Sequence, residues 1–149
     1  MVDTIELSAT PAAARSVRVG DHLPAVTRGP ITRGMLALFA GASNDHVLLH
    51  IDSDYAKAAG MDDVFAHGML SMAYLAQLLT GWRPASALRS WNVRFTAITP
   101  LQATVTCRGE VVEIIARDGE SLARVKIGAW IDGGVQTLDG QALVALGNG

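Results

Sequence analysis

The stretch GMLSMAYLAQLLTGW, Gly68–Trp82, decides the fold, because it contains no charged residue over fifteen positions. Its apolar residues lie on every face of a helix with 3.6 residues per turn, a pattern typical of a helix buried all round. A domain of this size can bury one helix fully by wrapping a sheet around it. We therefore expect one long central helix enclosed by strands.

Four later runs should supply that sheet. They are rich in β-branched and aromatic residues or alternate apolar with polar positions, as strands do. The runs are LRSWNVRFTAITP (88–100), ATVTCRGEVVEII (103–115), ARVKIGAWI (123–131) and VQTLDGQALVAL (135–146). Asp118-Gly119 and Asp132-Gly133 are hairpin signals between them. The predicted class is α+β, a curled antiparallel β-sheet wrapped around one long apolar central helix.

Shorter patterns precede the central helix. Residues 17–24, VRVGDHLP, are typical of a short strand that runs into a turn. Thr32 is a usable N-cap for a helix through RGMLALFAGAS (33–43). Residues 1–15 carry little pattern, so we expect a loose N-terminal arm followed by a single domain over residues 16–149.

A helical insertion should carry the active-site loop ahead of the central helix. The chain reads as loop up to Ile51 and then as a short helix. Asp52 or Ser53 can cap the start of that helix, and Gly60 can close its end in the left-handed conformation.

Composition excludes several classes of protein. The chain has 149 residues, of which 50% are apolar and 17% charged, and this favours one compact globular domain. A net charge of −2 gives no reason to expect a nucleic-acid partner, and no apolar run reaches transmembrane length. Arginines outnumber lysines ten to two, which suits phosphate binding but also fits a genomic preference for arginine.

Cysteine usage and the N-terminus favour a cytoplasmic location. Cys107 is the only cysteine, so no internal disulfide can form, and its alternating surroundings predict a small buried hydrophobe. The opening MVDTIELSAT carries acids and no basic region, so we do not expect a secretory signal.

Asp45 and His50 are the strongest candidates for catalysis. They lie five residues apart in a predicted loop, where both side chains can turn toward one point. A carboxylate and an imidazole that share a water can activate it, one taking a proton and the other giving a proton to the substrate. The alternative is a purely structural hydrogen bond between the two side chains.

His67 and Gly68 form the second candidate element. Gly68 should sit in the first turn of the central helix, where its N–H and the helix dipole can bind a carbonyl oxygen that becomes an enolate. The alternatives are that Gly68 only permits a tight entry into the helix and that His67 is a cap or a core histidine. His46 and His50 could bind zinc with Asp45 or Asp52, but no third strong ligand has matching spacing, so we expect no metal.

The segment ASNDHVLLHIDSDYAKAAGMDDVFAHGML, residues 42–70, resembles the signature of the MaoC-like, (R)-specific enoyl-CoA hydratases. WNVRFTAITP (91–100) resembles the strand after the long helix in the (3R)-hydroxyacyl-ACP dehydratases, and the resemblance covers about residues 17 to 146. The matching positions are Asp45, His50, Asp52, Ala56, Gly60, His67, Gly68 and Met69.

This resemblance implies a hot-dog fold, a homodimer or higher multiple joined edge to edge, and reversible syn hydration of trans-2-enoyl thioesters to (3R)-hydroxyacyl thioesters. It implies that Asp45 and His50 hold the water and that the Gly68 N–H holds the thioester carbonyl, with His67 beside it. It implies no metal or redox cofactor. The substrate would be an acyl thioester of CoA or acyl carrier protein, whose phosphates would meet exposed arginines.

The sequence departs from the family pattern between the two candidate catalytic residues. The family's Asn-Pro is Val47-Leu48 here, and Asn44 replaces a glycine. Either apolar packing of Val47 and Leu48 holds the loop in place of the proline, or the loop is relaxed and the enzyme is weak or inactive. We expect the first. A serine found in some relatives is Ala76 here, so that position receives no role.

Two other functions remain open on the same fold. A thioesterase would cleave the thioester, but enzymes of that kind usually place a carboxylate on or beside the central helix, and residues 68–82 carry none. A non-catalytic acyl-binding or partner subunit would explain Val47-Leu48, but not the presence of Asp45 and His50.

Overall fold

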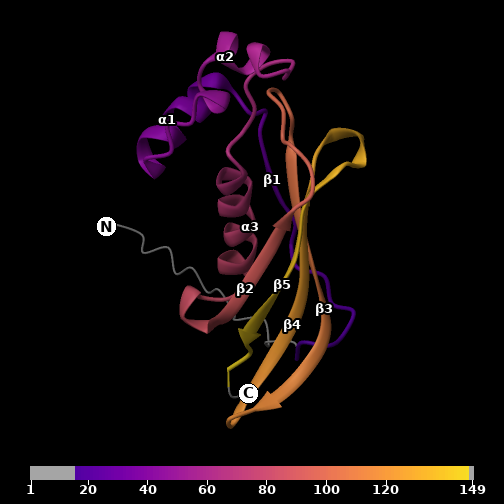
Figure 1. The fold of residues 1–149 in the computed structure, drawn as a ribbon. Helices are drawn as coiled ribbons and strands as arrows, with labels where there is room; N and C mark the ends of the chain where they lie inside the picture. The colour runs from indigo at the N-terminus through magenta and orange to yellow at the C-terminus, as the bar shows by residue number, and fades with distance from the viewer. Residues whose placement is uncertain (1–15, 148–149) are drawn as a thin grey trace, which may run out of the picture.

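The computed structural model describes residues 16–147, so the expected arm at residues 1–15 lies outside the described residues. One five-stranded sheet packs against a long helix, α3 (Figure 1). All neighbouring strands are antiparallel, in the order β1-β3-β4-β5-β2. The strands are β1 (Val26–Arg28), β2 (Leu88–Phe95), β3 (Val105–Arg117), β4 (Glu120–Trp130) and β5 (Gln136–Ala145).

The helices begin at the expected caps. The Thr32 hydroxyl accepts the Met35 N–H (3.2 Å), and an Asp52 oxygen accepts the Asp54 and Tyr55 N–H groups (3.0 Å each). Figure 1 shows α1 and α2 together at one end of the molecule, beyond the start of α3. The helices are α1 (Arg33–Ser43), α2 (Ser53–Ala58) and α3 (Gly68–Trp82), with 3₁₀ turns η1 (Leu48–His50), η2 (Ala85–Ala87) and η3 (Asp132–Gly134).

Helix α3 spans the predicted residues, but the prediction that it is buried all round is wrong for the single chain. Leu75 and Leu78 are buried against the sheet. Met69 is 53% exposed, and Ala73 and Gln77 on the same face are also exposed. The reason is that this sheet covers one side of α3 and leaves an uncharged outer face uncovered.

Two strand predictions also need correction. Residues 17–24 form no strand, because the chain turns at Gly20 (φ +90°) and only His22 makes an isolated bridge, to Glu110. The strand after α3 ends at Phe95 instead of continuing to position 100. The Thr96 hydroxyl donates to the Gln136 carbonyl (2.7 Å) where the strand ends, and residues 96–99 then pass the start of α3 as a loop.

The remaining sheet predictions are confirmed. Asp118 and Gly119 adopt positive φ angles and join β3 to β4, and η3 joins β4 to β5.

Cys107 is fully buried, and burial raises the pKa of its thiol to about 11, so it is an inert core residue. Within residues 16–147, no helix combines the length and apolarity that a membrane crossing requires.

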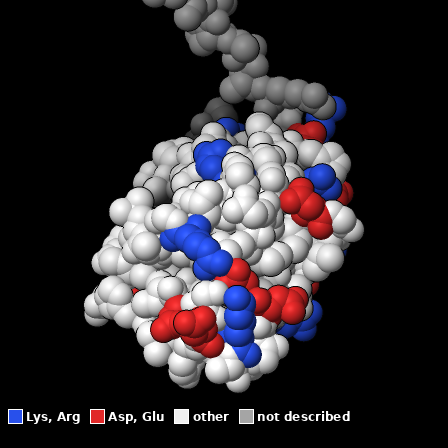
Figure 2. Space-filling model, turned by 90° about the horizontal axis from the view of Figure 1, so that it is seen from above, with Lys and Arg blue, Asp and Glu red and all other residues white. Residues whose placement is uncertain are grey.

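Charges are mixed on the surface. Figure 2 looks onto the end that carries α1 and α2, where uncharged residues cover most of the surface and the two signs of charge lie close together. Five arginines in the described part of the chain form ion pairs with carboxylates and are partly neutralised: Arg33, Arg89, Arg94, Arg117 and Arg124.

Candidate active site

Asp45 follows directly on the end of α1. That helix stops at Asn44, whose φ of +57° is left-handed, a conformation that asparagine tolerates. The Val47 N–H donates to Asp45 Oδ1 (3.4 Å), and the Asp45 carbonyl accepts a hydrogen bond from His67 Nε2 (3.0 Å). Asp45 is therefore held through its backbone, while its half-buried carboxylate keeps accepting capacity for another group.

His50 ends the η1 turn and has a defined proton arrangement. Its Nδ1 lies 2.8 Å from the Phe65 carbonyl oxygen. A carbonyl only accepts, so Nδ1 carries the proton and Nε2 keeps its lone pair. The His50 ring also meets the Phe65 ring edge-on, with centroids 4.9 Å apart. This geometry gives His50 an unprotonated nitrogen that can accept a proton.

His67 lies behind the other two residues. It is 1% exposed, directly before α3, and its ring stacks on His50 at 4.0 Å between centroids. Because Nε2 donates to the Asp45 carbonyl, Nδ1 holds the lone pair, and it has no hydrogen-bond partner among the described residues. Burial, the largest cause, lowers the pKa of His67. The imidazole is therefore neutral at pH 7.

Three side chains converge here, although sequence spacing indicated two. One nitrogen or oxygen atom from each of Asp45, His50 and His67 lies within 4.8 Å of the others. A water that hydrogen-bonds to two groups can bridge that separation. One carboxylate and two imidazoles could also hold a divalent metal by donor type. The sequence-derived zinc set is not assembled among the described residues, because His46 lies outside this cluster.

Gly68 starts α3 beside this cluster. Its N–H is one of the first-turn donors that find no partner inside a helix. A side chain at this position would collide with a neighbour, because an ideal Cβ would lie 2.7 Å from the Phe95 ring. A pocket of about 160 Å³ opens next to Gly68. The glycine therefore lets the Phe95 ring lie against the start of α3, and its backbone donor lies beside the pocket.

Backbone hydrogen bonds, and not the expected side-chain packing, hold the loop between Asp45 and His50. Val47 and Leu48 are 51% and 45% exposed in this chain, so the expected apolar packing is wrong. Backbone hydrogen bonds hold the loop instead, since the His50 N–H donates to the Val47 carbonyl (3.0 Å) and the Ile51 N–H to the Leu48 carbonyl (3.1 Å). The short turn stabilises itself, and its apolar side chains point away from the core.

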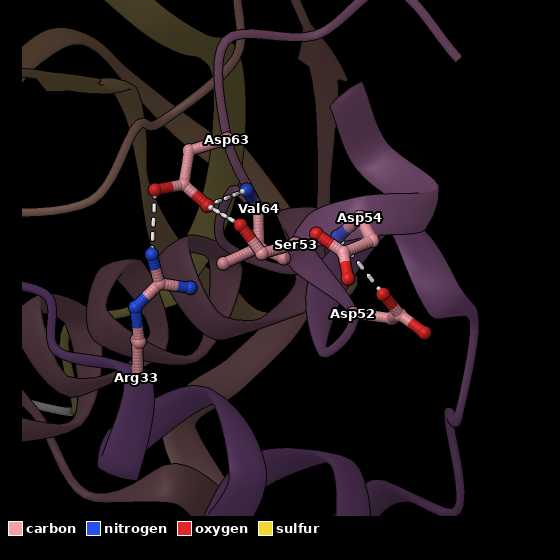
Figure 3. A network of polar contacts seen from close by, with 6 residues as sticks. All are labelled: Arg33, Asp52, Ser53, Asp54, Asp63 and Val64. Atoms are coloured by element: carbon pink, nitrogen blue, oxygen red, sulfur yellow. Dashed lines mark hydrogen bonds and ion pairs between the residues drawn. The ribbon is translucent and has the colours of Figure 1, made fainter. Parts of the chain in front are cut away.

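A polar network ties the insertion together on its other side (Figure 3). Asp63 accepts from Arg33 at the start of α1 (2.5 Å) and from the Ser53 hydroxyl at the start of α2 (2.9 Å). It also accepts the Val64 N–H (2.7 Å), and this backbone hydrogen bond is the largest cause that lowers the pKa of Asp63. Asp63 therefore links both helices to the segment that leads into His67.

Known proteins resemble the chain in sequence and in structure. The family model described as MaoC like domain matches residues 15–129. A 3-hydroxyacyl-thioester dehydratase Z from Mycobacterium tuberculosis is 32% identical over 117 residues, covering 74% of this chain and 75% of that protein.

Two solved structures share the architecture. The unliganded R-hydratase PhaJ1 from Pseudomonas aeruginosa superposes with a TM-score of 0.75 at 27% identity, over 87% of this chain and 82% of that one. An (R)-hydratase from A. caviae involved in PHA biosynthesis gives 0.77 at 24% identity, over 88% and 98%. These superpositions confirm the expected sheet and central helix.

Proposed function

The chain belongs to the MaoC-like dehydratase family and is a hydro-lyase with the hot-dog fold, and we propose that it hydrates trans-2-enoyl thioesters reversibly to (3R)-hydroxyacyl thioesters. The observation that carries this proposal is the convergence of Asp45 and His50 within 4.8 Å, beside the first turn of α3. That spacing suits one water held between a carboxylate and an imidazole.

His50 acts as the base in this proposal. The water oxygen bonds to C3 of the substrate while His50 Nε2 takes one of its protons, and the C2–C3 double bond shifts toward the thioester carbonyl. Asp45 accepts a hydrogen bond from the other water proton and fixes the direction of attack. The imidazolium then returns its proton to C2 on the same face, which gives syn addition and consumes one water.

The Gly68 N–H stabilises the charge that develops on the thioester oxygen. A first-turn helix donor is a favourable partner for an enolate oxygen, because the helix dipole adds positive potential there. His67 is too buried to touch the substrate, so its role is to hold the Asp45 backbone through Nε2.

The carrier is CoA or acyl carrier protein, and the reaction needs neither a metal nor a redox cofactor. Asp45, His50 and His67 would also suit a divalent metal, so chelation provides a direct check. Treatment with a strong chelator should leave the hydration rate unchanged. Loss of activity that added zinc restores would instead make the cluster a metal centre.

Substitution of the pair tests the reaction. Asp45→Asn and His50→Ala should each lower kcat for hydration of crotonyl-CoA by a factor of about 10² to 10⁴, because each removes a group that orients or deprotonates the water. The double variant should lose little more activity than the less active of the two single variants, since the two residues act together. Loss of the enoyl-thioester absorbance measures the rate.

His46→Ala is the matched control, because His46 is an exposed neighbour outside the cluster. It should keep full activity. A tenth of the activity remaining in either single variant would contradict the assignment. Release of free thiol would indicate a thioesterase. No measurable activity on any enoyl thioester would indicate a binding subunit.

A further inference from the structure

The side chains of Asp45, His50 and His67 meet the requirements of a metal site as well as those of the proposed reaction. His50 donates its Nδ1 proton to the Phe65 carbonyl (2.8 Å). His67 donates its Nε2 proton to the Asp45 carbonyl (3.0 Å). Metal-binding histidines almost always make such a hydrogen bond through their second ring nitrogen, because it fixes the tautomer and makes the first nitrogen more basic. His50 Nε2 and His67 Nδ1 are therefore prepared as metal ligands.

His67 Nδ1 gives an independent indication of a ligand. It has no hydrogen-bond partner among the described residues, although His67 is 1% exposed. A buried polar atom is costly unless a hydrogen bond or an ion satisfies it. The ring cannot easily turn away, since it contacts the His50 ring at 4.0 Å and the Phe39 ring at 5.1 Å between centroids. The lone pair of His67 therefore stays next to Asp45 and His50.

Asp45 supplies the negative charge of the site. One atom from each of the three side chains lies within 4.8 Å of the others. Two ligands of a tetrahedral zinc ion lie roughly 3.4 Å apart, so a separation at that limit has to shorten by about 1.4 Å. Rotation of the Asp45 carboxylate can supply most of this movement, because the group is half-buried and its hydrogen bond from the Val47 N–H is long (3.4 Å).

We propose that Asp45, His50 and His67 bind one divalent transition-metal ion, with zinc preferred, and that the bound ion inhibits hydration. Two imidazoles and one carboxylate suit Zn²⁺ or Co²⁺ and leave a fourth position for water, whereas Mg²⁺ and Ca²⁺ prefer oxygen ligands. Sequence spacing did not indicate this set, because His67 follows far beyond His50 in the chain.

The inhibition rests on the proposed function. The metal takes the lone pair of His50 Nε2, which accepts the water proton in that reaction, and it holds the Asp45 carboxylate that orients the water. A water on the metal can still lose a proton, but the imidazole nitrogen that returns a proton to C2 is then blocked. Occupation therefore stops the addition, and a chelator should restore the activity that added zinc removes.

Metal binding can be measured without the reaction. The chain is treated with chelator, dialysed, and titrated with Zn²⁺ by calorimetry and with Co²⁺ by visible absorption, which reports a four-coordinate site. We expect one ion per chain and no binding of Mg²⁺ in the same concentration range. His67→Gln keeps a donor for the Asp45 carbonyl but has no imidazole. It should weaken binding by more than about 10²-fold, since loss of an outer partner alone costs about 10- to 100-fold.

His46→Ala is the matched control, because His46 is an exposed neighbour outside the cluster. It should keep the wild-type affinity for Zn²⁺, whereas Asp45→Asn and His50→Ala should lose most of it. Thermal unfolding shows whether each variant is folded. Added Zn²⁺ should raise Tm in the wild type and in His46→Ala, but not in His67→Gln, because a ligand stabilises only the form that binds it.

Hydration of crotonyl-CoA gives the second readout. Zn²⁺ should reduce the wild-type rate in proportion to the occupied fraction measured by calorimetry, and excess chelator should restore the rate. If the chain adds no water under any condition, the proposed function and the inhibition fail together. One-to-one binding that is lost in His67→Gln would still establish the metal site in that case.

Three results would overturn the metal site or its effect. Equal binding in the wild type and in His67→Gln would show an adventitious ion only. Absence of binding in the wild type would make a buried water the partner of His67 Nδ1. A hydration rate that stays constant or rises at full Zn²⁺ occupancy would contradict inhibition.

Discussion

His67 contacts both Asp45 and His50 directly, but in the proposed reaction it does not touch the substrate. Its Nε2 fixes the Asp45 backbone and its ring stacks on His50, while the side chain itself is buried. These two contacts of His67 should therefore affect the rate of the chemical step more than they affect the affinity for substrate.

Replacement of His67 tests this role. In His67→Leu, Asp45 loses its donor, and a displacement of about 1 Å in a reacting group can lower the rate roughly 10²-fold. We expect kcat to fall by about that factor with little change in KM. In His67→Gln, we expect the side-chain amide to donate to the Asp45 carbonyl in place of Nε2 and to restore most of kcat. Equal losses in the two variants, tracked by equal losses in Tm, would show that His67 only fills space.

The residue types of the site could be predicted from the sequence, but their hydrogen bonds could not. Asp45 and His50 lie close in sequence, so a loop alone can bring them together. The partner that sets the His50 tautomer is the Phe65 carbonyl, fifteen residues away. Any residue can offer a carbonyl, so the sequence carries no signal for this contact.

The η1 turn is the element most changed from the family pattern, and its backbone suits the family residues. Val47 has φ −58° and ψ 126°, which a residue before proline adopts readily, and Leu48 begins the turn, where proline is well tolerated. Both side chains are about half exposed, so little packing would be lost.

Val47→Asn with Leu48→Pro should therefore keep or raise stability, by about 0.4–1 kcal/mol from the proline, and should keep or raise kcat/KM on short enoyl-CoAs. Thermal unfolding and steady-state kinetics measure the two effects, and the single variants separate them. A clear fall in Tm in both single variants would mean that the two side chains are packed in the working assembly, as the sequence had suggested.

The Asp63 network joins α1, α2 and the lead into α3, and it should contribute pH-dependent stability. The folded pKa of Asp63 lies below its ordinary value of 3.8. The contribution is therefore present above pH 3.8 and is lost as pH falls through the lower, folded value. Asp63→Asn should lower Tm at pH 7, and the difference from the wild type should shrink below about pH 4.

Asp62→Asn is the control for this measurement, because Asp62 is its exposed neighbour and should show almost no Tm difference at either pH. If the Tm deficit of Asp63→Asn is as large at pH 3 as at pH 7, the carboxylate charge does not support the network.

For the whole molecule, one long edge of the sheet is unpaired in the single chain. β2 has eight residues and pairs only with β5 among the described strands. Exposed edges of this length invite pairing with another chain. The neighbouring outer face of α3 is uncharged and exposed, so a second copy could cover both.

We therefore expect a dimer, or a multiple of one, in light scattering at micromolar concentration. Amide hydrogen exchange adds a local readout. All N–H groups of β2 should exchange slowly in the dimer, whereas one side of the strand would exchange fast in a monomer. A stable monomer with fast exchange along β2 would contradict edge pairing.

The whole-molecule level also explains the largest error of the sequence-based prediction. The sequence of α3 correctly predicts its length and its apolar character. An uncharged outer face has the same sequence pattern whether a sheet of the same chain or another molecule covers it. Met69, Ala73 and Gln77 therefore could not reveal that this sheet leaves them exposed.

Phe65 contacts His50 twice, since its carbonyl accepts from His50 Nδ1 and its ring meets the imidazole edge-on. Phe65 also lines the pocket of about 160 Å³ beside Gly68. This arrangement bears on how the chain can change over generations. Any residue at position 65 keeps the carbonyl, but a smaller side chain removes the edge-on contact and reshapes the pocket wall in the same step. If His50 is the base, a substitution at position 65 should therefore change the placement of the base and the space beside Gly68 together, whereas substitutions of Ile98 should change the pocket and leave the His50 contacts in place.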